Sequence, residues 1–248
     1  MIGRGFAYYR DNSTADLEMV ARRLRESKRK EIIKHPFKRA EFHINEVKVG
    51  KITKVEPNNP EEHRSYLPVL FRAAKVENMN DASLNKEETD ISVFSKKVET
   101  PYFFFSYIFD DLIIFSKFTD VKKIFGPYLS KKMGLDIATP GYNTEDIYTD
   151  YFSKKKVGGA GFYNRPGIAQ SGAVYYNMSN LGKKDIIVNE VQKAEKFMVR
   201  LILDIDGETI SANIYETGSI VLNQNWTSMG DYYSQYKILK DLLKPYEK

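Results

Sequence analysis

Short runs of alternating apolar and polar residues, separated by turn-forming residues, most limit the folds open to this chain. In the run 210–215 every second residue is a buried type, and its neighbours are polar or amphipathic. Side chains two positions apart lie on the same face of a strand, so this run predicts a strand buried on one side. A Glu-Thr-Gly turn at 216–218 and an apolar run at 219–223 follow it. Together these segments predict a β-hairpin.

Further strand-like runs recur along the chain and alternate with a few helical segments. Hydrophobic residues make up 42% and charged residues 29%, which is typical of a globular protein. We therefore predict an α+β fold with antiparallel sheets and packed helices. The predicted strands are 42–49, 51–55, 67–76, 91–98, 101–109, 112–118 and 196–204. The predicted helices are 13–35, 119–133 and 231–244.

Two polar tracts bear on the domain organisation. Residues 77–90 predict an exposed loop, and hence a boundary between a domain at 1–90 and an α+β domain at 91–248, although a single domain also fits. The tract 134–182 lacks periodicity and is rich in Gly, Tyr, Asn and Lys, which predicts an irregular basic loop region. A strand–turn–strand–helix pattern occurs near 102–132 and 210–244, which is consistent with a duplicated module.

The absence of cysteine excludes disulfides, thiolate nucleophiles and Cys-ligated metal sites. The first six residues lack the apolar segment of a secretory signal. The most apolar tract, 102–115, is too short to span a bilayer and contains two aspartates. We expect a cytoplasmic protein with no membrane contact.

The predicted helix 13–35 combines a narrow apolar stripe with a strongly basic face. The chain carries a net charge of +5, so an anionic partner such as nucleic acid is plausible chemistry for that face. Guanidinium groups suit bidentate contact with phosphate. A solvated surface helix remains the alternative. The candidate phosphate contacts are Arg22, Arg23, Arg25, Lys28, Arg29 and Lys30.

A second basic segment, 153–167, contains three consecutive lysines, closely spaced glycines and two aromatic residues. Glycines allow backbone N–H groups to approach phosphate, and aromatic rings stack on unpaired bases. The segment lacks the Gly-Lys-Ser/Thr ending of a Walker loop. A flexible basic surface loop is the alternative. The candidate contacts are Lys154, Lys155, Lys156, Phe162, Tyr163 and Arg165.

An acidic group follows the predicted strand 196–204. Asp204, Asp206 and Glu208 resemble the carboxylate sets that hold Mg²⁺ in phosphodiester cleavage. The competing interpretation is a hairpin turn, because Asp206 is followed by glycine. The three histidines lack the spacing of a local ligand pair, and no Gly-x-Ser-x-Gly elbow is present. Our leading interpretation includes no catalytic residues, no cofactor and no resident metal.

Residues 210–244 resemble the end of a half-repeat of the TATA-binding-protein-like family. In such repeats a strand reaches a Thr/Ser-Gly turn, an apolar strand returns and a helix packs behind. The resemblance covers 35 residues and implies a curved antiparallel sheet whose open face meets nucleic acid or a protein. It carries over no intercalating residue. The matching positions are Ile214, Thr217, Gly218, Ile220, Val221, Lys237, Leu239, Leu242 and Leu243.

These observations favour a non-enzymatic protein that binds DNA or RNA, as an accessory subunit of a larger complex. The lysine pairs at 122–123, 131–132 and 183–184 would add phosphate contacts, and Tyr151 would add a stacking ring. A metal-dependent nuclease that uses the acidic group is the first alternative. A protein–protein adaptor without nucleic-acid contact is the second.

Overall fold

The chain folds into two units, each built around antiparallel strands with packed helices. Unit 1 comprises Met1–Tyr9 and Ala138–Lys248, and unit 2 comprises Arg10–Ile137. The predicted α+β class with antiparallel sheets is confirmed. β8 (Ile137–Ala138) lies where unit 2 ends and the second part of unit 1 begins. This computed structural model describes residues 4–10, 16–26, 31–34, 40–54, 65–108, 111–116, 120–164, 171–176, 194–205, 207–223 and 229–248.

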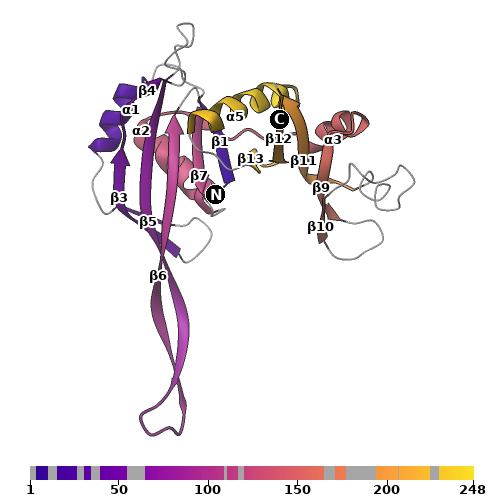
Figure 1. Ribbon diagram of the computed structural model, residues 1–248. Helices are drawn as coiled ribbons and strands as arrows, with labels where there is room; N and C mark the ends of the chain where they lie inside the picture. Colours follow the sequence, from indigo (N-terminus) through magenta and orange to yellow (C-terminus); the bar gives the residue numbers. More distant parts are fainter. Residues whose placement is uncertain are drawn as a thin grey trace. The chain divides into compact units, whose positions relative to one another are not determined.

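The sheet of unit 2 is antiparallel throughout, and its strands follow the order β7-β6-β5-β3-β2. Figure 1 shows β7, β6, β5 and β3 in this order. A short strand, β4, pairs with the start of β5. The alternation predicted near 42–49 and 67–76 is visible as burial, since every second residue from Ala40 to Ile44 is buried. The strands are β2 (Ile32–Lys34), β3 (Ala40–Val49), β4 (Thr53–Lys54), β5 (Ser65–Leu84), β6 (Ile91–Ile108) and β7 (Asp111–Ser116).

Two helices, α1 (Leu17–Arg25) and α2 (Asp120–Met133), belong to unit 2. The fully buried ring of Phe42 in β3 meets the rings of Tyr102 in β6 and Phe125 in α2 edge to face. These contacts, at centroid distances of 5.6 and 5.7 Å, join the sheet to the helix. The predicted helix 119–133 is confirmed as α2, with Pro127 inside it.

The predicted helix 13–35 is wrong in its second half. The carboxylate of Asp16 accepts a hydrogen bond from the backbone N–H of Met19 at 2.6 Å, and the helix ends at Arg25. Residues 32–34 instead form β2, which pairs with β3 at Ile33↔Phe42. Consecutive β-branched residues at 32 and 33 suit this strand better than a helix.

The expected loop at 77–90 is also wrong, because most of it is paired strand. β5 and β6 stay in register as far as Leu84↔Ile91, and only residues 85–90 make the turn. The expected boundary at 90/91 therefore lies at the tip of one hairpin inside unit 2, and the units divide at 9/10 and 137/138. A strand that buries neither face needs no apolar alternation, so its polar sequence looks like a loop.

The sheet of unit 1 has the strand order β10-β9-β11-β12-β13-β1. The predicted hairpin at 210–223 is confirmed as β12 and β13, with Ile214↔Ile220 in register. The first strand of the chain, β1, pairs with β13 at Gly5↔Ile220. The strands are β1 (Arg4–Arg10), β9 (Val157–Asn164), β10 (Ser171–Tyr176), β11 (Lys196–Ile205), β12 (Glu208–Tyr215) and β13 (Ser219–Leu222).

The helices of unit 1 are α3 (Thr144–Ser153) and α5 (Met229–Leu243), followed by the 3₁₀ turn η2 (Lys244–Tyr246). The helix predicted at 231–244 corresponds to α5. The expected irregular tract at 134–182 is wrong where α3, β9 and β10 occupy it, while residues 165–170 and 177–182 lie outside the described residues. Each unit therefore contains two antiparallel strands followed by a helix, β6–β7–α2 and β12–β13–α5, in the order that the sequence pattern predicts.

A lysine is buried in unit 1 beneath α3. Lys196 of β11 is 1% exposed, and its Nζ donates to Oε2 of Glu145 at 2.7 Å and to the carbonyl of Ala194 at 2.9 Å. The same ammonium lies 4.5 Å from the ring centroid of Tyr148. Glu145 also accepts the backbone N–H of Lys196 at 2.6 Å. The Glu145 carboxylate of α3 thus binds both the ammonium and the backbone N–H of Lys196, and so ties β11 to the helix.

Candidate nucleic-acid interface

The basic helix uses two of its arginines to hold unit 2 together. Nη1 of Arg23 donates to the carbonyl of Met133 at 2.6 Å, and Nη2 of Arg25 donates to the carbonyl of Gly50 at 3.2 Å. Arg22 is exposed on the same helix. Arg23 and Arg25 therefore make structural contacts within the unit. Arg22 is the described arginine of α1 best placed for an external phosphate. Lys28, Arg29 and Lys30 lie outside the described residues.

A groove of about 540 Å³ lies beside α1 and α2 in unit 2. Within it the carboxylate of Glu31 accepts hydrogen bonds from the Tyr128 hydroxyl and from Nζ of Lys132. Burial by itself raises the pKa of Glu31. The two hydrogen bonds and the Lys132 charge outweigh that effect and hold the pKa below its ordinary value. The lining residues are Arg23, Glu26, Glu31, Tyr128, Lys131 and Lys132.

The lowered pKa of Glu31 predicts how the stability of the protein changes in acid. The ionised Glu31 contributes stability above the pKa of the unfolded chain, and that contribution is lost as pH falls through the folded-state pKa. We expect Glu31→Gln to lower the melting temperature at pH 7 and to have a smaller effect at pH 3. Melting curves of both proteins at the two pH values test this. An effect that is equal or larger at pH 3 would contradict it.

The lysine segment 154–156 forms the turn between α3 and β9. Lys154 and Lys155 are exposed, and Lys155 has a left-handed φ of 58°. Nζ of Lys154 lies 5.1 Å from the ring centroid of Tyr151, the predicted stacking residue. Nζ of Lys156 pairs with Oδ2 of Asp204 at 2.7 Å. Lys154 and Lys155 therefore present their ammonium groups to solvent, whereas the charge of Lys156 is matched within the unit.

The predictions for the glycine-rich part of this segment are wrong for the described residues. Phe162 is completely buried in β9, so it is not available to stack on a base. A Cβ at Gly158 would lie 2.6 Å from Cδ1 of Ile202, and one at Gly161 would lie 2.7 Å from Cζ of Phe197. These glycines make room for side chains of β11 rather than for phosphate. The side chain of Tyr163 and all of Arg165 lie outside the described residues.

The acidic group at the end of β11 is divided between two faces of the sheet. Asp204 is opposite Thr209, whereas Glu208 is opposite Ile205, one position along the register. Successive positions face opposite sides, so Asp204 and Glu208 do not converge on one ion. Asp206 lies outside the described residues. Among the residues that are described, no group of three or more His, Asp or Glu side chains could hold a metal ion.

Both described carboxylates of this group already have partners. Asp204 accepts hydrogen bonds from Lys156 at 2.7 Å and from Oγ1 of Thr209 at 2.9 Å. The Lys156 hydrogen bond, helped by Thr209 and by the Lys156 charge, lowers the pKa of Asp204. Glu208 accepts from Nε2 of Gln235 in α5 at 2.7 Å. These contacts give Asp204 and Glu208 structural roles on the two faces of the same hairpin end.

The half-exposed face of β11, β12 and β13 carries a polar cluster that the sequence predictions did not include. Nε of Arg200 donates to Oγ of Ser211 at 3.1 Å. Nδ2 of Asn223 lies 3.2 Å from Oδ1 of Asn213 and 3.4 Å from the same Ser211 oxygen. The "polar cluster" therefore comprises Arg200, Ser211, Asn213 and Asn223. It links β11 and β12 to the residue that directly follows β13.

The opposite face of these strands is the buried one. Ile210, Ala212 and Ile214 of β12 are at most 1% exposed, while the intervening Ser211 and Asn213 are partly exposed. Gln235 of α5 reaches Glu208, which shares the parity of Ile210. We infer that α5 packs on the apolar face. The polar cluster therefore lies on the face turned away from α5.

Several kinds of hydrogen-bonding group lie together on this face. A guanidinium, two carboxamides and a hydroxyl present donors and acceptors side by side. Ser211 and Asn213 were the outward half of the predicted alternation. That alternation was the sequence signal from which Ser211 and Asn213 could have been found. Arg200 and Asn223 could not, because only the strand register brings them to Ser211 and Asn213.

Comparisons of the chain with protein families, with curated proteins and with solved structures find no match. None of the helices in the described part of the chain combines the length and apolar character that crossing a membrane requires.

Proposed function

We propose that this protein binds nucleic acid without catalysing its chemistry, and that the polar cluster of unit 1 is the central contact. The observation that carries the proposal is the row of Arg200, Ser211, Asn213 and Asn223 on a sheet face opposite the helix. Arginine and asparagine side chains read base edges in both grooves of DNA and on unpaired bases of RNA. The resemblance of residues 210–244 to TATA-binding-protein-like half-repeats also favours a sheet face as the contact surface.

Exposed lysines of the same unit supply the electrostatic part of this proposal. Lys154 and Lys155 form the turn into β9, which pairs directly with β11, the strand of Arg200. Phosphate contacts of this kind raise affinity for every sequence and weaken as salt increases. In unit 2, Arg22 is a candidate for a further contact of the same kind. Binding as an accessory subunit of a larger complex is part of this proposal.

The test is an anisotropy titration with single- and double-stranded DNA and RNA at low salt. We expect Arg200→Ala to weaken binding about 5- to 150-fold for the preferred nucleic acid, corresponding to roughly 1–3 kcal/mol for a base-edge contact. Lys154→Ala should instead weaken binding to all sequences and reduce the salt slope by about one.

The matched control is Lys244→Ala, which also removes one positive charge. Lys244 is exposed in η2, away from the polar cluster in sequence and on no strand of the sheet. A similar loss in Lys244→Ala and Arg200→Ala would attribute binding to net charge alone. An absence of binding to all four nucleic acids at low salt would end the proposal.

A further inference from the structure

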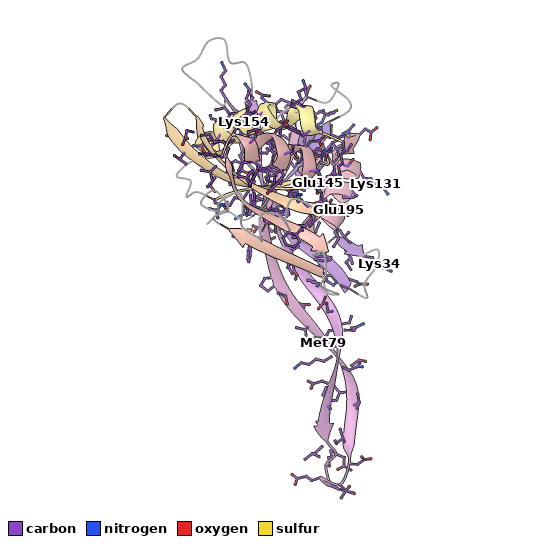
Figure 2. All side chains as sticks on the ribbon, turned by 90° about the vertical axis from the view of Figure 1, so that its right-hand side faces the viewer. Lys34, Met79, Lys131, Glu145, Lys154 and Glu195 are labelled. Atoms are coloured by element: carbon purple, nitrogen blue, oxygen red, sulfur yellow. The ribbon has the colours of Figure 1, made fainter. Side chains whose placement is uncertain are left out.

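The hairpin of β5 and β6 continues well beyond the sheet of unit 2. The pairing of β3 with β5 ends at Ala40↔Glu77, and the pairing of β7 with β6 begins only at Phe105. Residues 78–84 and 91–97 pair with each other and with no other described strand. Figure 1 shows this two-stranded segment extending from the sheet, and Figure 2 shows Met79 partway along it. We call residues 78–97 the ribbon.

One face of the ribbon is apolar near the tip. Leu84 pairs with Ile91, and Ala82 pairs with Val93, so these four side chains share one face. Leu84, Ile91 and Val93 are 58, 65 and 69% exposed. On the other face the exposed Met79 and Phe94 are each opposite a charged residue, Lys96 and Asp81. Only the first face therefore carries adjacent apolar pairs, which mark an interaction surface more often than single residues do.

Charge varies along the ribbon in a self-complementary way. The tip carries Glu87, Glu88 and Asp90 against one lysine, Lys86, and all four are exposed. Toward the base, the exposed Lys97 lies on the apolar face, whereas Lys96 lies on the other face and pairs with Asp81 at 3.8 Å. Two ribbons packed antiparallel through the apolar face would place the acidic tip of each beside Lys97 of the other. An isologous contact around a two-fold axis requires this kind of self-complementarity.

The tip is held in one conformation by its own hydrogen bonds. Oδ1 of Asn85 accepts the backbone N–H of Thr89 at 2.9 Å and that of Asp90 at 3.3 Å. The Asn85 N–H donates to the carbonyl of Asp90 at 2.8 Å. Glu88 adopts a left-handed φ of 57°. A turn ordered in this way presents the adjacent apolar pairs at little further entropic cost.

We propose that the ribbon is a self-association arm, whose apolar face packs antiparallel on the same face of a second copy. A nucleic-acid partner is disfavoured, because the ribbon has no excess of basic side chains: residues 78–97 contain four acidic and three basic ones. A two-stranded hairpin is only marginally stable alone, so covering this face also stabilises the arm. The inference does not depend on nucleic-acid binding by unit 1.

The contact is small, so the dimer is expected to be reversible. We expect a two-stranded ribbon to bury less than the roughly 800 Å² per partner of a standard interface, as transient complexes do, and to dissociate at about 10–1,000 μM. Sedimentation equilibrium of the full chain, free of nucleic acid, should show a monomer–dimer equilibrium in that range. A sample that stays monomeric at the highest concentration would overturn the proposal.

Two neighbouring residues provide the matched variants. Val93 lies on the apolar face, whereas Ser92, opposite Ser83, lies on the other face, and both are exposed. We expect Val93→Lys to weaken dimerisation at least about tenfold and Ser92→Lys to leave it almost unchanged. Equal effects of the two variants, or none from Val93→Lys, would contradict the proposed face. Unchanged melting temperatures would show that both variants fold.

Charge reversal tests the antiparallel arrangement. Glu87→Lys/Glu88→Lys should weaken association, and so should Lys97→Glu. Mixing the two variants should restore a heterodimer, since each tip then meets a Lys97 position of opposite charge. A failure of the mixture to associate more strongly than either variant alone would exclude this arrangement. Association of the chain only with a different protein would exclude a second copy as the partner.

Discussion

Glu145→Ala is expected to destabilise unit 1 by about 2–4 kcal/mol. The substitution leaves the ammonium of Lys196, which is 1% exposed, with the carbonyl of Ala194 and the Tyr148 ring as its remaining described partners. It also removes the acceptor of the Lys196 backbone N–H. Because the Glu145 side chain is itself 43% exposed, the loss falls below that of a fully enclosed pair.

A double-mutant cycle isolates the charge from the backbone contact. Lys196→Met removes the ammonium while keeping a long apolar side chain, so Glu145→Ala/Lys196→Met should recover a large part of the loss. Glu145→Gln should be milder than Glu145→Ala, because its amide oxygen can still accept the Lys196 N–H. Denaturant unfolding followed by circular dichroism measures all four variants. A cost below about 1 kcal/mol for Glu145→Ala would show that water compensates the lysine.

Gly218→Ala is expected to be at least as damaging, at about 3 kcal/mol or more. Gly218 ends the turn between β12 and β13 with φ of 85°, and an added Cβ would lie 1.7 Å from the carbonyl oxygen of Pro140. The obstacle is backbone, so it cannot rotate away as a side chain would. The same turn receives a hydrogen bond from the N–H of Tyr142 to the carbonyl of Glu216 at 3.0 Å, and displacement would disturb it.

Gly207 provides a control with almost the same backbone conformation. Its φ is 84°, and an added Cβ would meet no atom within 4 Å. Gly207→Ala should therefore cost only the left-handed conformation, about 1–2 kcal/mol. The difference between the two variants in denaturant unfolding measures the steric contact with Pro140. Equal losses of unfolding free energy in the two variants would mean that the backbone at Pro140 shifts to accommodate the added Cβ.

The hairpin 210–223 and the helices α2 and α5 could be predicted because their sequence periods report burial directly. Each buries one side against the rest of its unit, so apolar residues recur at strand or helix spacing. The ribbon and β9 do not obey this rule. The ribbon buries neither face, and β9 replaces alternating side chains with glycines that accommodate Ile202 and Phe197.

The candidate site was harder to predict than the fold, because it exists only in the strand register. Arg200 and Ser211 lie on two strands, Asn223 directly follows a third, and together they form no linear motif. The basic helix and the lysine segment are conspicuous in sequence, yet Arg23, Arg25 and Lys156 have partners within their own units. A local count of charges does not reveal which of them are already neutralised or hydrogen-bonded.

The pairing of β1 with β13 has a consequence for the order in which the chain folds during synthesis. The segment Arg10–Ile137 is continuous, so unit 2 can complete its contacts once its last residues have emerged from the ribosome. β1 is made earlier than any other strand, but its partner in unit 1 arrives more than 200 residues later. Closing so long a loop is slow. The pairing of β1 with β13 is therefore completed only near the end of synthesis, when unit 2 can already have folded.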